Sequence, residues 1–298
     1  MEHQINGYAV VIGGVNTDIW GRPARALVPR DSNPGRVSAR PGGVGRNIAH
    51  DLRLLGMDVS LIAAVGGDAY GSGILENCGA LGMDMSMALI LPERRSSTYL
   101  YVTDENGDMQ VGIADMDIVR CLTPDFLAAH MGRINAASAV VLDANLETET
   151  LGYLARSCTA PLYADPVSTA KATRLLPALG ALRAIKPNAL EAAALTGESD
   201  PARAARALIA AGVRRVFVSL GSGGMIAAEG ETLLRLPCEN ARVVNTTGAG
   251  DAATAAIVWA DAGGLGLEQT ARAAIRAGAL TAGCAEANNP ALATLSGR

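Results

Sequence analysis

Short apolar runs alternate with alanine-rich helical patterns along most of the 298-residue chain. The runs are apolar throughout, which is typical of strands buried on both faces of a parallel sheet. They lie at 8–14, 59–66, 138–145, 161–166, 183–188 and 214–221. Helical patterns follow most of them, at 46–55, 72–80, 148–157, 170–178, 189–196, 202–211, 250–262 and 267–284. The alternation predicts an α/β fold with a doubly wound, mostly parallel central sheet that helices flank on both faces.

Two segments depart from this alternation. Residues 98–115 form two alternating runs around Asn106-Gly107, which is a strong signal for a β-hairpin. Residues 16–40 are rich in Pro, Arg, Gly and Ser and have no helical periodicity, so we expect them to pair with the hairpin. Together the two segments predict a small β lid over one end of the sheet. No linker or repeat divides the sequence, so we expect residues 1–298 to form a single domain with this lid.

Charge and cysteine content limit the binding partners and the cell compartment that we expect. The formal net charge is −4 without a block of lysines or arginines, which argues against a nucleic-acid or anionic-membrane surface and favours a small molecule. No uninterrupted apolar run approaches the roughly 18 residues of a membrane helix. Five scattered cysteines without a C-x-x-C pair, and no signal peptide before them, are typical of reduced thiols, so we expect a cytoplasmic protein.

The stretch 245–260 places one carboxylate, Asp251, directly after the glycine-rich turn Gly248-Ala249-Gly250. With the alanines that follow, it matches the G-x-G-x-x-G/A fingerprint of dinucleotide-binding enzymes. Against that interpretation, the motif lies near the C-terminus and puts Asp251 where the phosphates of a dinucleotide would sit. The same carboxylate is suited to take a proton from a hydroxyl that attacks a phosphoryl group, while the turn's amides stabilise the developing charge. Both interpretations stay open at this point.

Two segments near the N-terminus are candidates for contacts with a sugar. The glycine-rich turn in 41–56 runs straight into an amphipathic helix, where Asn47 either hydrogen-bonds a ligand hydroxyl or caps the helix. Asn16 and Asp18 follow the first strand, at the end where ligands bind in open α/β sheets. A carboxylate such as Asp18 can accept from two neighbouring sugar hydroxyls, although Asn and Asp are also ordinary turn residues.

Two later motifs lie at strand ends and are candidates for a nucleotide site. Asn188 and Glu191 have the spacing of a capping box, which needs no further function. Their oxygen-bearing side chains are equally suited to hydrated Mg²⁺ and phosphate oxygens. The turn 219–224 contains three glycines and either holds ribose and phosphates with its amides or simply closes a hairpin. No G-x-x-x-x-G-K-[ST] motif occurs, so any ATP is held without a P-loop.

Four motifs, in this order and spacing, resemble the ribokinase-like (PfkB) family of sugar and nucleoside kinases across essentially the whole chain. They are the glycine motif at 42–47, K-P-N-x-x-E at 186–191, S-L-G-S-x-G at 219–224 and T-T-G-A-G-D at 246–251. Within the family, the chain is most similar to the subgroup that phosphorylates pseudouridine, through 42–49, 113–118 and 165–171. Ribokinases carry lysine where this chain has Val44, which argues against free ribose as the best substrate and leaves room for a ribose that bears a base.

The resemblance implies roles for the matching residues. It implies Asp251 as the catalytic base, and an anion hole formed by Gly248, Ala249 and Gly250. It implies sugar contacts for Asp18, Gly42, Gly43 and Asn47, with Asn16 close by. It implies nucleotide contacts for Asn188, Ser219, Gly221, Gly224 and, more loosely, Asn289, with Glu191 and Asn188 placing the metal. The alternation of the hairpin adds four residues expected to face the base: Thr98, Tyr99, Asp115 and Met116.

We therefore expect an ATP-dependent kinase that phosphorylates the 5′-hydroxyl of a ribose-containing substrate, with pseudouridine as the leading candidate. Ribose, or another sugar or nucleoside, is the alternative. The resemblance implies Mg²⁺ with the ATP, leaves room for a monovalent cation such as K⁺, and suggests a homodimer formed through the lid. A lid would also exclude water, so that ATP is not hydrolysed in place of transfer. Two other classes remain: a sugar- or nucleoside-binding module without catalysis, and a dinucleotide oxidoreductase.

Overall fold

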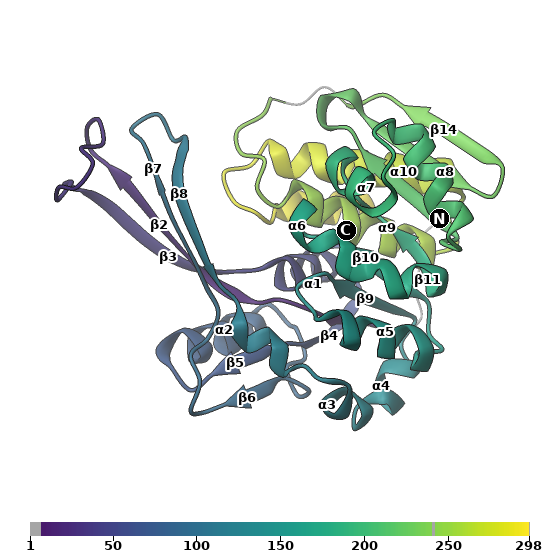
Figure 1. Cartoon of the computed structure of the whole chain (residues 1–298), viewed down its shortest axis with the longest axis horizontal. Coiled ribbons are helices and arrows are strands. Elements are labelled where there is room, and N and C mark those ends of the chain that lie inside the picture. Colours follow the sequence, from purple (N-terminus) through teal and green to yellow (C-terminus); the bar gives the residue numbers. More distant parts are fainter. Residues whose placement is uncertain (1–6, 240–241, 298) are drawn as a thin grey trace.

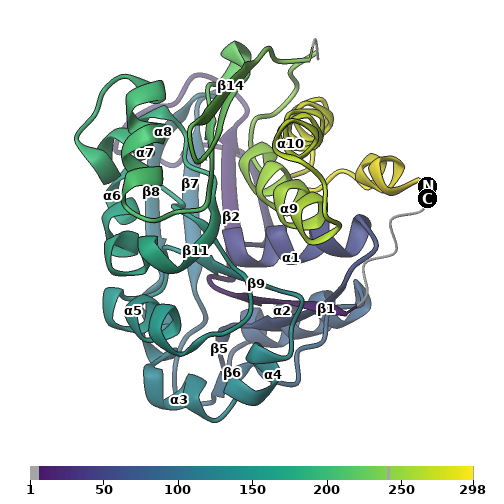
Figure 2. The same cartoon turned by 90° about the vertical axis from the view of Figure 1, so that its right-hand side faces the viewer.

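The structure is a computed structural model that describes residues 7–239 and 242–297. An eight-stranded sheet flanked by helices forms its main body (Figures 1 and 2). In spatial order the strands are β14 (Thr232–Leu236), β13 (Met225–Glu229), β12 (Arg215–Ser219), β11 (Leu182–Ile185), β10 (Leu162–Asp165), β9 (Ala139–Asp143), β1 (Tyr8–Ile12) and β4 (Asp58–Ile62). All neighbours from β4 to β12 are parallel, whereas β13 and β14 add an antiparallel edge. The predicted doubly wound α/β fold is confirmed.

Alternate residues of one strand enter two different cores, which explains why the strand sequences are apolar throughout. In β1, Ala9 and Val11 pack into one core, and Val10 and Ile12 into the other. One core is covered by α1 (Val44–Leu54), α2 (Ala69–Ala80), α9 (Ala249–Ala262) and α10 (Leu267–Ala282). The other is covered by α3 (Pro124–Ala128), α4 (Met131–Asn135), α5 (Thr148–Ser157), α6 (Thr169–Ala172), α7 (Ala189–Thr196) and α8 (Pro201–Ala210).

Two predicted elements differ in detail from the structure, and some short elements were missed. The helix expected at 170–178 is wrong in type, because after α6 the chain continues as the 3₁₀ helix η2 (Thr173–Ala181), which contains Pro177. Proline lacks an N–H group and its ring clashes with the preceding turn, so an α-helix does not pass through it. The strand expected at 59–66 divides after Ile62, and β5 (Ala64–Gly66) pairs instead with β6 (Leu89–Leu91). Sequence periodicity also missed β14 and the two short helices α3 and α4, which are only five residues long.

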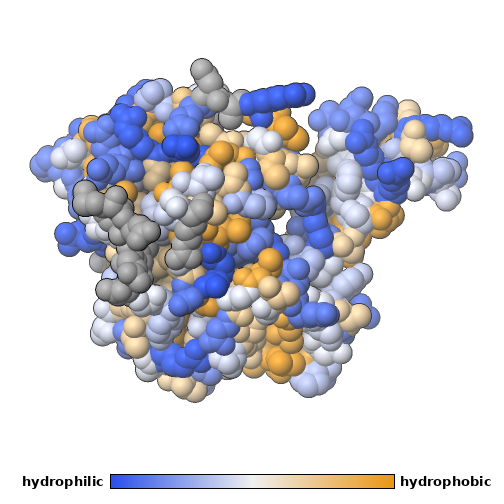
Figure 3. All heavy atoms as spheres, turned by 180° about the vertical axis from the view of Figure 1, so that it is seen from behind, coloured by the Kyte–Doolittle hydropathy of each residue, from blue (hydrophilic) through white to orange (hydrophobic). Residues whose placement is uncertain are grey.

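A second, four-stranded sheet projects from the body (Figure 1). We call it the lid sheet; its strands are, in order, β3 (Gly35–Gly42), β2 (Asn16–Pro23), β7 (Thr98–Thr103) and β8 (Met109–Asp115). β7 and β8 form the antiparallel hairpin expected at 98–115, and β2 pairs with β7 in parallel. From behind, the molecule is hollowed between the lid sheet and the body (Figure 3). Closure of this sheet over a ligand stays a prediction.

Three short 3₁₀ helices complete the description: η1 (Asp117–Cys121), η3 (Gly221–Gly223) and η4 (Pro290–Ser296). Within residues 7–239 and 242–297, no helix combines the length and the apolar character needed to cross a bilayer.

Candidate active site

Polar side chains gather where the central parallel strands end. Asp143 ends β9, Asp165 ends β10, and Lys186 follows β11 directly. Because parallel strands point the same way, their carboxyl ends meet at one edge of the sheet, which is where open α/β sheets bind ligands. Helix α9 lies against this edge, since the hydroxyl of Thr254 donates to Asp165 at 2.6 Å. The site is therefore built from strand ends and from the start of α9.

The first turn of α9 presents free backbone amides beside Asp251. Gly248 precedes the helix with φ 82°, and a Cβ on it would come within 2.0 Å of the carbonyl oxygen of Ala287, so glycine is required there. In the part of the chain that the structure describes, the N–H groups of Gly250 and Asp251 have no acceptor, whereas that of Ala249 bonds Thr246. Free amides at a helix N-terminus attract anions, so Gly250 and Asp251 offer two donors here, whereas the Ala249 amide is already engaged. The anion hole itself stays a prediction.

Asp251 contacts α1 across a long sequence separation. The side-chain amide of Asn47 donates to its carboxylate at 2.9 Å. Asn47 does not cap α1, whose N-cap is Gly43 without a side-chain hydrogen bond. A Cβ built on Gly43 would lie 2.6 Å from the carbonyl oxygen of Gly14, so this glycine (φ 102°) lets α1 begin directly against the end of β1. The tight turn thus brings Asn47 to the catalytic candidate.

The electrostatics of Asp251 suit a proton acceptor. Burial raises the pKa of Asp251 to about 8, and the negative charges of Asp165 and Asp143 add to the rise. The hydrogen bond from Asn47 and the ammonium of Lys186 lower the same pKa. A base whose pKa lies near neutral pH combines a usable unprotonated fraction with a real tendency to take a proton. The environment therefore favours general-base chemistry.

Lys186 and Asp165 are site residues to which sequence reasoning assigned no role. Their side chains form a buried ion pair with an N–O distance of 3.6 Å. The Lys186 ammonium also lies near α9, 3.5 Å from the point where a Cβ on Gly250 would be. It places a positive charge beside the free amides. The sequence feature that could have identified both residues is their position directly at the ends of two apolar strands.

The predicted sugar contacts lie together at the base of the lid sheet. Asn16 donates to the Asp18 carboxylate at 2.6 Å, and a Cβ on Gly42 would come within 2.2 Å of that carboxylate. Asn16 also lies against Gly43. Burial raises the pKa of Asp18, while the bond from Asn16 and the nearby Arg40 and Arg46 oppose the rise. A diol that reached Asp18 would find an acceptor already held in place.

The strand register separates the residues that the hairpin was expected to direct at a base. Asp18 pairs with Tyr99, whose neighbour on β8 is Ala114. Thr98 and Asp115 belong to the adjoining row, so they lie on the opposite face of the lid sheet from Asp18. Met116 does reach the site, because its methyl carbon lies 3.2 Å from the position of a Cβ on Gly14.

The face of the lid sheet that carries Asp18 is aromatic. Trp20 follows Asp18 by two residues and pairs with Tyr101, so Trp20, Tyr99 and Tyr101 share that face. The rings of Tyr99 and Tyr101 stack with their centroids 5.5 Å apart. Only ten of the 298 residues are Phe, Trp or Tyr, so this small face is enriched in aromatic side chains. Aromatic rings offer stacking surfaces for a nucleobase.

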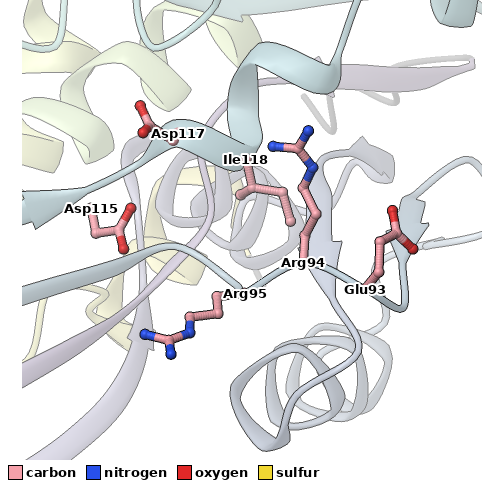
Figure 4. A pocket seen from close by; sticks show the side chains of 6 residues that line it. All are labelled: Glu93, Arg94, Arg95, Asp115, Asp117 and Ile118. Atoms are coloured by element: carbon pink, nitrogen blue, oxygen red, sulfur yellow. The ribbon is translucent and has the colours of Figure 1, made fainter.

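A separate pocket of about 350 Å³ lies where the lid sheet joins the body (Figure 4). Its lining contains three carboxylates and two guanidinium groups: Glu93, Arg94, Arg95, Asp115, Asp117 and Ile118. Apart from Asp115, none of these residues was predicted to bind a ligand. The pocket shares no residue with the strand ends around Asp251, so it does not belong to the site described above.

The two candidate nucleotide motifs are adjacent in the structure. The backbone N–H of Ser219 donates to the carbonyl of Pro187 at 2.9 Å, and Ser219 forms a β-bridge with Asn188. After Ser219, the turn that contains Gly221 and Gly224 closes an antiparallel hairpin between β12 and β13. Asn289 is engaged locally, since it caps η4 and donates to the carbonyl of Leu280. Its side chain therefore holds the C-terminal segment together.

Asn188 and Glu191 form the predicted capping box. Asn188 accepts from the N–H of Glu191 at 2.9 Å, and one Glu191 oxygen accepts from the N–H of Asn188 at 2.8 Å. The second Glu191 oxygen has no protein partner among the described residues. Among all residues that the structure describes, no group of three or more His, Cys, Asp or Glu side chains is arranged to hold a metal. One free carboxylate oxygen suits an Mg²⁺ ion held mainly by water and substrate phosphates.

Replacing Glu191 with Gln separates these two roles. Glutamine also serves in a capping box, so we expect thermal stability close to wild type. If Glu191 holds hydrated Mg²⁺, the variant needs roughly tenfold more Mg²⁺ for half-maximal rate, the usual loss when a supporting metal contact is removed. Asp200→Asn, at the N-cap of α8, is the matched control. An unchanged Mg²⁺ titration of Glu191→Gln leaves only the capping role.

These groups support transfer of a phosphoryl group to a hydroxyl, since a base, free amides and a buried ammonium surround one strand edge. The class is therefore that of phosphotransferases with an alcohol group as acceptor. The comparison with known families agrees with this class. The chain belongs to the pfkB family of carbohydrate kinases, whose profile matches residues 6–294.

Individual proteins show how close the relationship is. The chain is 36% identical to the pseudouridine kinase of Escherichia coli (strain K12), over 96% of this chain and 93% of that protein. A solved carbohydrate kinase from Agrobacterium tumefaciens is 30% identical with a TM-score of 0.86, covering 97% and 96% of the two chains. An Arabidopsis thaliana ribokinase, solved with ribose and ATP, is 22% identical with a TM-score of 0.84, covering 97% and 98%. At 22% identity, the similarity to the ribokinase shows a shared fold.

Proposed function

We propose that this kinase transfers the terminal phosphoryl group of ATP to the 5′-hydroxyl of pseudouridine. The observation that carries the proposal is the half-buried Asp251 carboxylate at the N-terminus of α9, beside the amide of Gly250, which has no acceptor among the described residues. In this assignment Asp251 takes the proton of the 5′-hydroxyl. The amides of the first turn and the ammonium of Lys186 then neutralise charge on the phosphoryl oxygens.

A nucleoside acceptor is supported by the face of the lid sheet next to Asp18. In this proposal Asp18 and Asn16, which are hydrogen-bonded to each other, bind ribose hydroxyls, and Tyr99 and Tyr101 on the same face offer rings on which a base can stack. Val44 stands where ribokinases carry lysine. The relative at 36% identity is named as a pseudouridine kinase, which favours this nucleoside over others. Free ribose or another sugar is the second candidate.

ATP and Mg²⁺ belong to the proposal. Ser219, Gly221 and Gly224, next to Asn188, are the residues proposed to line the nucleotide site. Mg²⁺ would be held by the nucleotide's phosphates and, through water, by the free oxygen of Glu191, and it would supply charge neutralisation on those phosphates. A monovalent cation such as K⁺ is part of the proposal only by family resemblance. Measuring ADP release with pseudouridine, uridine, adenosine, ribose and fructose tests the acceptor.

A homodimer formed through the lid sheet is the proposed assembly. Beyond Thr98 and Asp115, the face opposite Asp18 is apolar and open: Val111 and Ile113 are 51% and 59% exposed, and Leu100 is the partner of Ile113 on β7. Exposed contiguous apolar surface of this kind marks protein interfaces. A second copy of the chain offers the same face, as a twofold dimer requires.

Sedimentation tests this assembly. We expect wild-type protein to sediment as twice the 30.5 kDa chain mass, and Val111→Glu with Ile113→Glu to sediment as the single chain, because burying two carboxylates in an apolar contact is unfavourable. Gln110→Glu, which adds one carboxylate beside the apolar pair and leaves both apolar side chains in place, is the control. A single-chain mass for the wild type contradicts the proposal.

A cytoplasmic location also remains a proposal. It is supported by the five cysteines, all of which are free thiols.

A further inference from the structure

Arg46 is a buried cation whose acceptors are all amide oxygens. It lies on α1 directly before Asn47 and is 7% exposed. Its guanidinium donates to side-chain oxygens of Asn288 at 2.6 Å, Asn77 at 2.9 Å and Asn47 at 3.1 Å. Within the described residues it forms no ion pair with a carboxylate. Burying a charged group without an oppositely charged partner costs free energy, so we expect Arg46 to have a function other than a salt bridge.

The guanidinium determines which way the Asn47 amide points. An asparagine side chain has one oxygen that only accepts and one nitrogen that only donates. Because the oxygen of Asn47 accepts from Arg46, its nitrogen is directed at the Asp251 carboxylate. In the reversed orientation, the amide oxygen would face the carboxylate and the NH₂ group would face the guanidinium. Both contacts would then be repulsive.

Asn288 holds Arg46 from the other side. It is 9% exposed and lies between α10 and η4. Its oxygen accepts from Arg46, while its nitrogen donates to Asp51 at 2.8 Å and to the backbone carbonyl of Asn47 at 3.1 Å. The preceding residue, Ala287, is the one whose carbonyl packs against Gly248. One short segment therefore contacts both the turn before α9 and the helix that carries Asn47.

We infer that Arg46 and Asn288 are positioning residues, which fix the Asn47 amide with its NH₂ group toward Asp251 and so hold the catalytic carboxylate in place. The inference rests on the proposed function and adds two residues to it. Neither needs to touch the substrate, because both act through Asn47. We therefore expect their main effect on kcat, with a smaller effect on acceptor binding, because Asn47 is a predicted sugar contact and Arg46 lies near Asp18.

Arg46→Met keeps an unbranched side chain of similar length and removes every donor. We expect kcat to fall by roughly 10- to 100-fold, since misplacement of a catalytic group by about 1 Å costs up to about 100-fold. The KM for the acceptor should change by a smaller factor than kcat, because Arg46 itself makes no predicted acceptor contact. Arg53→Met is the control on the same helix. Arg53 donates to the backbone carbonyl of Met57 and to the carboxylate of Asp58, away from Asn47, so the variant should keep wild-type kcat.

A double substitution shows whether Arg46 acts through Asn47. Once Asn47→Ala has removed the amide, adding Arg46→Met should lower kcat by less than about threefold more, because groups that act as a unit are not additive. Asn288→Ala, alone and on the Asn47→Ala background, repeats the measurement if Arg46→Met fails to fold.

Three results would overturn the inference: wild-type kcat in the single variants, a loss confined to KM, or losses that multiply on the Asn47→Ala background. The two levels of proposal fail differently. A wild-type protein that phosphorylates none of the acceptors refutes the proposed function. An active wild type that needs Asp251 but tolerates Arg46→Met and Asn288→Ala refutes only the positioning role.

Discussion

Asp251→Asn is expected to lower kcat by roughly 10²- to 10⁴-fold, the usual contribution of a positioned general base. Asparagine keeps the shape of the side chain and its place in the first turn of α9, but it cannot take a proton from the acceptor hydroxyl. Folding should not be weakened, because burial already disfavours the charged form of this carboxylate, as its raised pKa shows. Thermal unfolding of the variant is the control that separates lost chemistry from lost structure.

The pH dependence of the wild-type rate is a second test of Asp251 as the general base. Since burial raises the pKa of Asp251 to about 8, the protonated and inactive fraction grows as the pH falls below that value. We expect kcat/KM to fall about tenfold per pH unit on that side. The residual activity of Asp251→Asn should lack this limb. Near-normal turnover in the variant, or the same acid limb in both proteins, would show that Asp251 is not the base.

Pseudouridine should be preferred to uridine by several powers of ten in kcat/KM, and to ribose by about one to two powers of ten. Pseudouridine joins its base to the sugar through C5, which leaves N1–H as a donor that uridine lacks. A site that accepts from this N–H leaves a buried acceptor unpaired when uridine binds, and such mismatches cost up to about 10⁴- to 10⁵-fold. Ribose loses instead the stacking surface of Tyr99 and Tyr101, worth about 1–3 kcal/mol per base.

The measurement is kcat/KM for the three acceptors at saturating ATP and Mg²⁺. Adenosine serves as a control for size, because it carries a larger base without the N1–H pattern of pseudouridine. Ribose equal to or better than pseudouridine would contradict the acceptor assignment and leave the kinase class unchanged. Equal kcat/KM for pseudouridine and uridine would show that the site does not use the extra N1–H donor.

The sequence predicted those parts of the fold that depend on local patterns. Apolar strands identified the central sheet, and Asn106-Gly107 identified the hairpin between β7 and β8. Asp251, Asn188 and Glu191 could be proposed as site residues because a short motif contains each of them. Local patterns failed at Pro177, where a helical periodicity continued through a residue that cannot support an α-helix.

The rest of the site depends on contacts between residues far apart in the chain. Asn47 and Asp251 are 204 positions apart, and Arg46 and Asn288 are 242 apart. No periodicity links such pairs. The faces of the lid sheet show a related limit: a shift of one residue exchanges the two faces of a strand. The pairing of Asp18 with Tyr99, and not with Thr98, was decided by tertiary contacts.

The place of β1 in the main sheet has a consequence for synthesis of the chain. One neighbour, β9, pairs Ala139 with Ala9, so it leaves the ribosome 130 residues later. At about 5–20 residues per second, this interval is on the order of ten seconds. Meanwhile one edge of an apolar strand has no partner, and unpaired edges are templates for aggregation. We expect the half-made chain, more than the finished enzyme, to be the form that depends on chaperones.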